Sequence, residues 1–271
     1  MHKKPRGGRP WALRIAMHSL AKNPVALVTG SAKRIGRAVA QELANRGYRI
    51  VIHANRSIEE ARQFAHALNQ NDGEAIAVQA ELRDAAEIER MVSAAVSHFG
   101  RIDALVNSAA IWKRKSLEQI TADDVREHFE INTLGTFLCC QQVGLRMCAQ
   151  PEGGAIVNIA DWAIERPYVD YAAYFPSKGA IPTITRTFAV ELAKRNPRVR
   201  VNAILPGPVM LPANLPAAER TAAIAGTLAR REGTPLHVAE AVVFLLENDF
   251  ITGACLPVDG GRTVFGGSFT R

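Results

Sequence analysis

The feature that most constrains this chain is a regular alternation, from Pro24 onward, of short apolar runs with longer segments of helical period. Apolar runs that are each followed by a helix form parallel strands, and the helices cover both faces of the sheet. The predicted strands lie at 25–30, 48–55, 75–82, 104–110, 155–160, 199–207 and 255–261, and the predicted helices at 35–47, 57–73, 84–100, 121–149, 171–195 and within 216–247. We therefore expect an α/β fold with one doubly wound parallel sheet and helices on both faces.

The length of 271 residues, with no internal linker or repeat, fits a single domain. No run of about 18 apolar residues occurs, so the sequence predicts no membrane span. The four cysteines have no metal-binding spacing, and no secretory signal precedes them. This pattern favours free thiols in a reducing cytoplasm and a protein without a bound metal.

The net charge of +7 lies almost wholly in residues 1–22, which hold six cations and no acid and leave +1 for the rest of the chain. No basic face for nucleic acid is therefore expected on the body of the protein. We predict that residues 1–23 are a disordered basic extension and that residues 24–271 form the folded domain. An organelle transit peptide, or a start codon placed too early ahead of Met17, remains an alternative for the extension.

The first predicted strand leads into the turn TGSAKRIGRAVA at residues 29–40. A turn in this place can present backbone N–H groups and a helix N-terminus to the pyrophosphate of a dinucleotide. Gly30 and Gly36 allow the tight turn and the close approach of the backbone. Arg34 replaces the usual middle glycine, with Lys33 before it; both are ordinary surface cations in the alternative interpretation. We expect a dinucleotide site of Rossmann type here.

The second predicted strand ends in HANRS, with Arg56 and Ser57 and no acidic residue. A site selective for NADH places an acid there for the ribose 2′-hydroxyl. The cations Lys33, Arg34 and Arg56 and the Ser57 hydroxyl suit a 2′-phosphate instead, because arginine binds phosphate through paired hydrogen bonds. We therefore predict NADPH as the cofactor. Glu81, at the end of the third strand, either accepts from the adenine amino group or is a surface carboxylate.

Tyr174 and Lys178 stand one helical turn apart, so their side chains share a face of the predicted helix. A free phenol has a pKa of about 10 and gives up its proton poorly at neutral pH. A neighbouring ammonium favours the phenolate and lowers that pKa, which suits general acid catalysis. The alternative is a structural tyrosine and lysine on an amphipathic helix.

These segments, taken in order, resemble the short-chain dehydrogenase/reductase family. The shared motifs are TGSAKRIG, NSAA at 107–110, Asn132 in EINTLGTF, Tyr174-x-x-x-Lys178, LPGP at 205–208 and VDGG at 258–261. The resemblance implies hydride transfer with Tyr174 as the acid. Lys178 would bind the nicotinamide ribose and lower the phenol pKa, and Asn132 would hold a water that links Lys178 to solvent. It also implies cofactor contacts from Gly30, Ile35, Gly36, Leu82, Asn107, Ala109, Pro206 and Gly207.

Asp161 lies thirteen residues before Tyr174, where most members of that family have serine. A serine hydroxyl donates to a carbonyl oxygen that becomes an oxyanion, whereas an ionised carboxylate only accepts and would repel it. Reduction of a C=N bond is different, because hydride reaches carbon and nitrogen must collect a proton. Asp161 can then orient the Tyr174 hydroxyl and help to relay protons to that nitrogen. The alternative is an acid that caps a helix or a loop.

This combination resembles the pteridine reductases and the bacterial dihydromonapterin reductases. They pair TGxxKRIG and an RS ending of the second strand with an aspartate and Tyr-x-x-x-Lys. In pteridine reductases an aromatic residue shortly after the NxA segment stacks on the pterin, opposite the nicotinamide. The resemblance implies that Trp112, Arg34, Asp161 and Tyr174 contact a pterin, unless Trp112 only closes the mouth of the cleft.

We therefore predict an NADPH-dependent reductase that converts a dihydropterin to a tetrahydropterin. Two alternatives remain open: an NADPH-dependent reductase of a ketone such as a 3-oxoacyl thioester, and a sensor that binds NADPH without turnover. The intact set of Asn132, Tyr174 and Lys178 argues against the sensor. Related enzymes pair their corresponding long helices between subunits, so we also expect a homotetramer. Arg271 in the tail either reaches a neighbouring active site or is frayed.

Overall fold

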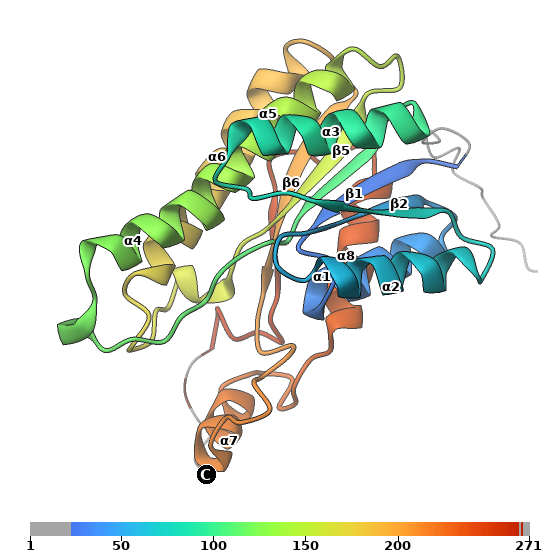
Figure 1. Cartoon of the computed structure of the whole chain (residues 1–271). Helices are drawn as coiled ribbons and strands as arrows, with labels where there is room; N and C mark the ends of the chain where they lie inside the picture. Colours follow the sequence, from blue (N-terminus) through green and yellow to red (C-terminus); the bar gives the residue numbers. More distant parts are fainter. Residues whose placement is uncertain (1–22, 266, 268–271) are drawn as a thin grey trace, which may run out of the picture.

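The computed structural model describes residues 23–265 and 267, and this part of the chain forms one parallel sheet between two layers of helices (Figure 1). The strands are β1 (Val25–Thr29), β2 (Arg49–Ala54), β3 (Ala75–Gln79), β4 (Ala104–Asn107), β5 (Gly154–Ile159), β6 (Val199–Pro206) and β7 (Cys255–Val258). Their order is β3-β2-β1-β4-β5-β6-β7, and every neighbouring pair is parallel. The chain thus builds outward from β1 in one direction and then in the other, which confirms the predicted doubly wound sheet.

Helices cover both faces of this sheet. They are α1 (Arg34–Asn45), α2 (Ile58–Asn69), α3 (Ala85–Phe99), α4 (Ala122–His128), α5 (Gly135–Cys148), α6 (Tyr174–Ala193), α7 (Ala217–Ala225) and α8 (Pro235–Glu247). Figure 1 shows α1, α2 and α8 on one face and α3, α5 and α6 on the other. Helix α7 stands apart from the sheet and buries no side chain, so it does not contribute to the core.

One of the predicted helices is divided in the structure. The segment at 121–149 consists of α4, a π-helical turn at Phe129–Leu134 (η2), and α5. Asn132 in this turn binds the backbone of Ile111, with Oδ1 accepting from Ile111 N at 2.8 Å and Nδ2 donating to Ile111 O at 3.0 Å. A π turn places one extra residue in the helix, and such turns are frequent at functional sites. The period of the sequence carries no sign of it.

The predicted helical region at 216–247 also falls into two helices. Helix α7 ends at Gly226, and α8 begins with Pro235 after Thr234, which forms a capping box with His237. Proline suits the first helical position because its missing N–H has no partner there. Because of this break the chain leaves the sheet at α7 and returns to it at α8. Helix α7 therefore lies over the carboxyl ends of the strands.

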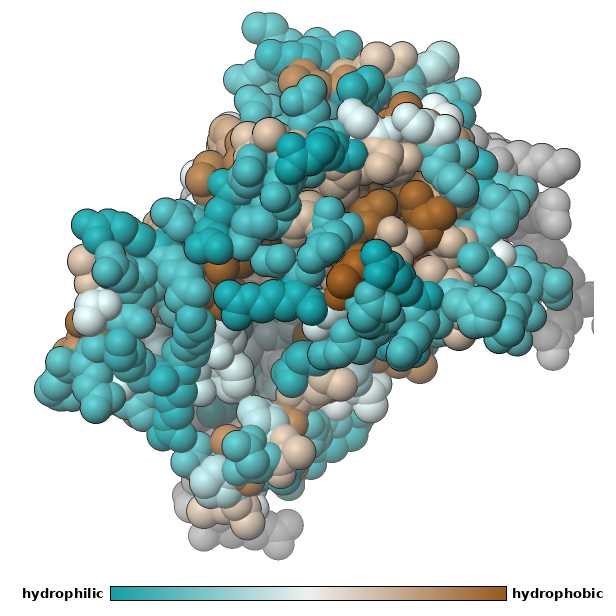
Figure 2. Space-filling model, viewed as in Figure 1, coloured by the Kyte–Doolittle hydropathy of each residue, from teal (hydrophilic) through white to brown (hydrophobic). Residues whose placement is uncertain are grey.

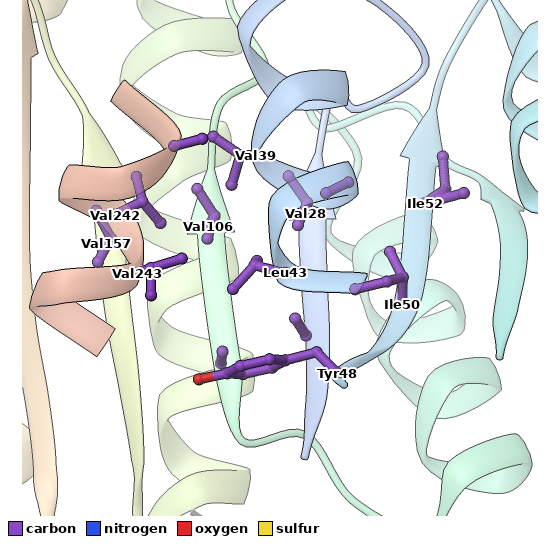
Figure 3. Packing of buried hydrophobic residues seen from close by; sticks show 14 of the residues in the cluster. Val28, Val39, Leu43, Tyr48, Ile50, Ile52, Val106, Val157, Val242 and Val243 are labelled. Carbon is purple, nitrogen blue, oxygen red and sulfur yellow. The ribbon is translucent and has the colours of Figure 1, made fainter. Parts of the chain in front are cut away.

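The sheet separates two layers of buried apolar side chains. In one layer, Val28 and Val106 of the sheet pack with Val39 and Leu43 of α1 and Val242 of α8 (Figure 3). The other layer lies beneath α3, α5 and α6. Because every residue of β1, β4, β5 and β6 is buried, these central strands are held on both faces. The loops at their carboxyl ends therefore start from fixed positions.

The sequence predicted no membrane span, a disordered N-terminal extension and a possible role for the C-terminal tail. In residues 23–265 and 267, no helix is long and apolar enough to cross a membrane. Residues 1–22 of the predicted extension and Arg271 of the tail lie outside the described residues, so the expectations for them stay predictions.

Candidate active site

A cleft of about 1120 Å³ opens at the carboxyl ends of the strands. It is visible in Figure 2 as a shaded hollow between the protruding part that carries α7 and the rest of the molecule. Most of the predicted site residues line it. They are Gly30, Lys33, Arg34, Ile35, Gly36, Arg56, Glu81, Leu82, Ala109, Pro206 and Gly207 from the predicted cofactor set, with Trp112, Asp161, Tyr174 and Lys178.

Two glycines shape the turn between β1 and α1. Gly30 has a φ of +64°, and a Cβ on it would lie 2.7 Å from Ala109 Cα. A Cβ on Gly36 would lie 2.5 Å from the Gly30 carbonyl oxygen. Both positions therefore require glycine. The turn brings the N-terminus of α1 to the cleft, which is the arrangement that binds a pyrophosphate.

His53 supports this turn through hydrogen bonds and was not predicted as a site residue. Its Nδ1 accepts from Gly30 N at 3.1 Å, and its Nε2 donates to the Ala80 carbonyl oxygen at 3.0 Å. Burial lowers the pKa of His53, which favours the neutral ring that these two bonds need. A polar residue inside the otherwise apolar second run was the signal that could have revealed it.

The three cations predicted for the 2′-phosphate differ in their partners. Lys33 Nζ lies 2.6 Å from a Glu60 carboxylate oxygen, and Arg34 Nη2 donates to the Met210 carbonyl oxygen at 3.3 Å. Arg56 lines the cleft and has no carboxylate partner among the described residues. Arg56 is therefore the cation at the end of β2 whose charge is most available to a phosphate.

Glu81 is held by neighbouring side chains at the end of β3. Its Oε2 accepts from Asn55 Nδ2 at 3.0 Å and from Arg83 Nη2 at 2.7 Å. The hydrogen bond from Arg83 also holds the pKa of Glu81 below its usual value. The carboxylate is ionised and fixed at the rim of the cleft, and its contact with an adenine stays a prediction.

Asp161, Tyr174 and Lys178 meet at the other end of the cleft. Asp161 follows β5 and caps a short 3₁₀ helix, Trp162–Ile164 (η3), with Oδ1 accepting from Ala163 N at 2.8 Å. Its second oxygen, Oδ2, accepts from Tyr174 Oη at 2.7 Å. Lys178 Nζ donates to the Ile159 carbonyl oxygen at 2.6 Å. The capping role and the contact with Tyr174 therefore coexist, because each uses a different carboxylate oxygen.

Burial determines how these three groups titrate. Burial and then the Asp161 charge raise the pKa of Tyr174 well above its ordinary value, so the expected lowering by Lys178 does not occur in this structure. Burial raises the pKa of Asp161, against the hydrogen bonds from Ala163 and Tyr174. Burial also lowers the pKa of Lys178 to about 8, although the Asp161 charge opposes it. At neutral pH the phenol is therefore protonated, and its hydroxyl donates to the buried carboxyl group of Asp161.

Three predicted residues, Ser57, Asn107 and Asn132, do not line the cleft. Asn107 Nδ2 donates to Asn158 Oδ1 at 2.9 Å, which turns its side chain into the sheet where β4 pairs with β5. Asn132 Nδ2 donates to Ser177 Oγ at 3.0 Å and so joins the π turn to α6. Ser57 precedes α2, and its hydroxyl makes no capping bond. The amides of Asn107 and Asn132 position the site, and the water expected on Asn132 stays a prediction.

Aromatic rings line the cleft beside Tyr174. Trp112 is 40% exposed and stacks on Tyr171, with ring centroids 4.8 Å apart and planes 7° apart. Tyr168 meets the edge of Tyr171 at 5.1 Å. Trp112 therefore lies in the cleft as predicted and offers a flat surface whose orientation is fixed by a second ring.

Replacing Asp161 by asparagine is expected to stabilise the fold, and increasingly so as the pH rises. Burial raises the folded-state pKa of this carboxyl above its unfolded value of about 3.9. The folded wild type therefore binds more protons than the unfolded chain, and its stability falls as the pH rises above that value. Urea unfolding of both proteins at several pH values checks this expectation.

The two unfolding free energies should agree only well below about pH 3.9, where the carboxyl is neutral in both states. Asp123→Asn, at an exposed carboxylate of α4, is the control and should show no such growing difference. A wild type that gains stability relative to Asp161→Asn as the pH rises would contradict the raised pKa.

The sequence is similar to a known protein family and to several proteins named as reductases or dehydrogenases. The family model described as enoyl-(acyl carrier protein) reductase matches residues 30–263. A Streptomyces violaceoruber protein named granaticin polyketide synthase putative ketoacyl reductase 2 is 37% identical over 88% of this chain and 95% of its own. A 3-oxoacyl-[acyl-carrier-protein] reductase of Synechocystis is 36% identical over 89% of this chain and 97% of its own. A D-threitol dehydrogenase of Mycolicibacterium smegmatis is 36% identical over 89% and 93%.

These names describe reductases of ketoacyl groups and a dehydrogenase, so they do not support the expected likeness to pteridine reductases. The chain is an oxidoreductase and belongs to the short-chain dehydrogenase/reductase family.

Proposed function

We propose that the cleft binds NADPH and that the enzyme reduces a C=N bond of a flat, pterin-like heterocycle. The hydrogen bond of 2.7 Å from Tyr174 Oη to Asp161 Oδ2 carries this proposal. It sets an acceptor beside the acid, at a position where an oxyanion would meet a negative charge. A ring nitrogen that needs a proton meets instead a buried hydroxyl, whose single proton is directed at Asp161 Oδ2 in the structure and turns to the nitrogen for the transfer.

The residues on the cofactor side fit NADPH. The turn after β1 is too tight for side chains at Gly30 and Gly36, which allows the backbone to lie against a pyrophosphate. Arg56 offers a guanidinium without a carboxylate partner among the described residues to the 2′-phosphate. NADPH in this position supplies the hydride.

The side chains of the protein deliver the proton. Tyr174 is the proton donor; burial and the Asp161 charge keep its hydroxyl protonated at neutral pH but also make it a weaker acid, so the transfer depends on stabilisation of the phenolate. Asp161 orients that hydroxyl through Oδ2. Lys178 lies one helical turn away and stabilises the phenolate left after proton transfer to nitrogen. Trp112, fixed by Tyr171, provides a surface on which a flat ring stacks.

A second candidate is the reduction of a 3-oxoacyl thioester, and the names of the relatives favour it. The granaticin and Synechocystis proteins described above are named for ketoacyl reduction, and so is a human 3-oxoacyl-[acyl-carrier-protein] reductase, 33% identical over 88% of this chain. In this second candidate Asp161 caps η3 and takes no part in the reduction of the ketone. The geometry at Asp161 favours the C=N substrate, and the relatives favour the thioester.

The test is NADPH oxidation by the wild type with two substrates, a 7,8-dihydropterin and acetoacetyl-coenzyme A. We expect a higher kcat/KM for the dihydropterin. A higher kcat/KM for the thioester would replace the first candidate with the second. Steady oxidation with either substrate would also exclude the sensor without turnover.

NADPH is expected to bind about tenfold or more tightly than NADH, because a charge-assisted hydrogen bond to the 2′-phosphate is lost with NADH. Arg56→Ala should remove most of this preference. Lys33→Ala is the matched control, and its effect should be smaller because Glu60 already holds the Lys33 ammonium. Fluorescence titration gives the dissociation constants. Equal constants for NADPH and NADH in the wild type would contradict the assignment.

The proposal also retains the homotetramer. Several large apolar side chains of the π turn, α5 and α6 are exposed on the isolated chain, which supports burial of these helices between subunits. They are Phe129, Leu134, Phe137, Leu145 and Val190.

A further inference from the structure

Arg262 lines the same cleft as the proposed catalytic pair, and no part of the proposed reaction uses it. We propose that Arg262 binds an anionic oxygen group of the substrate, such as a carboxylate. The inference rests on the proposed function in one respect only, that a small substrate lies next to Tyr174. It adds a chemical requirement for that substrate, whichever bond is reduced.

The turn after β7 fixes the backbone that carries Arg262. Asp259 accepts from Gly261 N at 2.8 Å and from Thr263 N at 2.6 Å. Gly260 and Gly261 have φ values of +63° and +80°, which glycine adopts without strain. The side chain of Asp259 thus binds the backbone on both sides of Arg262, and this fixes the position of the Arg262 backbone.

The guanidinium of Arg262 lies between η3 and the end of α7. Its Cζ is 5.2 Å from the ring centroid of Trp162, the residue directly after Asp161. A Cβ on Gly226 would lie 1.0 Å from Arg262 Nη1, so the guanidinium occupies the space that a side chain would fill there. Arg262 is therefore held near the reacting end of the cleft, against a flat ring and a glycine.

The charges along the cleft single out Arg262. Most of the other cations that line it have carboxylate partners: Lys33 with Glu60, Arg83 with Glu81, Lys113 with Glu127, and Arg114 with Asp170 and Glu219. Within the described residues, Arg34, Arg56, Lys178 and Arg262 have none, and Lys178 already belongs to the proposed catalytic set. Arg34 and Arg56 adjoin the dinucleotide turn and serve the cofactor phosphates. Of these four cations, Arg262 alone lies against Trp162, the residue directly after Asp161.

The surroundings of Arg262 favour a bound anion. Arg166 Nη1 donates to the Arg262 carbonyl oxygen at 3.3 Å, which brings a second guanidinium close. Burial and the Arg166 charge both lower the pKa of Arg262, so its ionised form is less stable here than in water. A carboxylate would relieve both effects, and a planar guanidinium binds it through two hydrogen bonds.

A structural alternative is that Arg262 only caps the C-terminus of α7, where a cation is favourable. The hydrogen bonds of the described residues include none from this guanidinium to a carbonyl of α7. The capping role predicts that loss of Arg262 weakens the fold but leaves the preference between charged and neutral ligands unchanged. The two roles are therefore separable by experiment.

The test compares ligands that differ in charge but share a ring. Calorimetric titration in the presence of NADP⁺ gives dissociation constants for pterin-6-carboxylate and 6-hydroxymethylpterin. We expect the carboxylate to bind about ten- to a hundredfold more tightly to the wild type. Arg262→Ala should remove this preference, and Arg262→Lys should retain part of it. NADP⁺ affinity should stay unchanged in both variants.

Two further variants sharpen the result. Gly226→Ala places a methyl group where the guanidinium lies and displaces it without removing its charge, so it should also reduce the preference. Arg166→Ala removes one of the two effects that favour the anion, so it should lower the preference less than Arg262→Ala does. A wild type without charge preference, or an Arg262→Ala variant that keeps it, would overturn the proposal.

The kcat/KM values for acetoacetate and methyl acetoacetate separate this proposal from the choice of substrate. If the enzyme reduces the ketones and binds neither pterin, the pterin function fails. The anion site still stands in that case if acetoacetate is preferred and Arg262→Ala abolishes the preference. If a pterin is reduced without any charge preference, the function stands and the anion site fails.

Discussion

Tyr174→Phe is expected to lower kcat by about 10²–10⁴-fold, the usual contribution of a general acid, while NADPH binds as before. Phenylalanine keeps the buried ring, which packs at 5.3 Å from Phe175, and loses only the hydroxyl that donates to Asp161. The fold should therefore survive the change. Single-turnover oxidation of bound NADPH measures the chemical step directly.

Tyr171→Phe is the matched control for this variant. Tyr171 lines the same cleft, and the substitution keeps its stacking on Trp112 while removing another hydroxyl. Its kcat should change little. If Tyr174→Phe keeps most of the wild-type kcat, the proton comes from another group and the role of Tyr174 is wrong.

Asp161→Ser is expected to change the two candidate activities in opposite directions. Reduction of a dihydropterin should fall by about tenfold or more, because the acceptor that orients the Tyr174 hydroxyl is lost. Reduction of a ketone should hold steady or rise, because a serine hydroxyl donates to an oxyanion that the carboxylate repels. Cofactor affinity should not change.

Glu165→Ser controls for the loss of a carboxylate near the cleft. Glu165 follows η3 and is exposed, and it does not line the cleft. Neither activity should respond to this change. If Asp161→Ser lowers both activities in parallel, Asp161 acts as a structural cap through its bond to Ala163, and the C=N proposal loses its support.

The fold could be predicted because its central strands are buried on both faces. Such strands appear in the sequence as continuous apolar runs, and the residues of β1, β4, β5 and β6 are all buried in the structure. The π turn at Asn132 could not be predicted, because a tertiary bond to Ile111 accompanies it and the helical period does not show it. Helical segments were predicted within 216–247 without the position of the break between α7 and α8, although Gly226 and Pro235 were visible signals.

Site residues could be predicted where they directly follow the carboxyl end of a strand, because the cleft lies at those ends. Gly30, Arg56 and Asp161 all line the cleft for that reason. The titration of Tyr174 was not predictable, because burial and the Asp161 charge outweigh the lysine, and neither strength can be read from a spacing. Arg262 was missed because the turn that aims it at Trp162 exists only in three dimensions.

The central claim is that Asp161 selects a substrate with a nitrogen that must be protonated. The most direct measurement is the ratio of kcat/KM for a 7,8-dihydropterin to kcat/KM for acetoacetyl-coenzyme A, in the wild type and in Asp161→Ser. The account predicts a ratio well above one in the wild type and a fall of about tenfold or more in the variant. A wild-type ratio below one, or an identical ratio in both proteins, would contradict it.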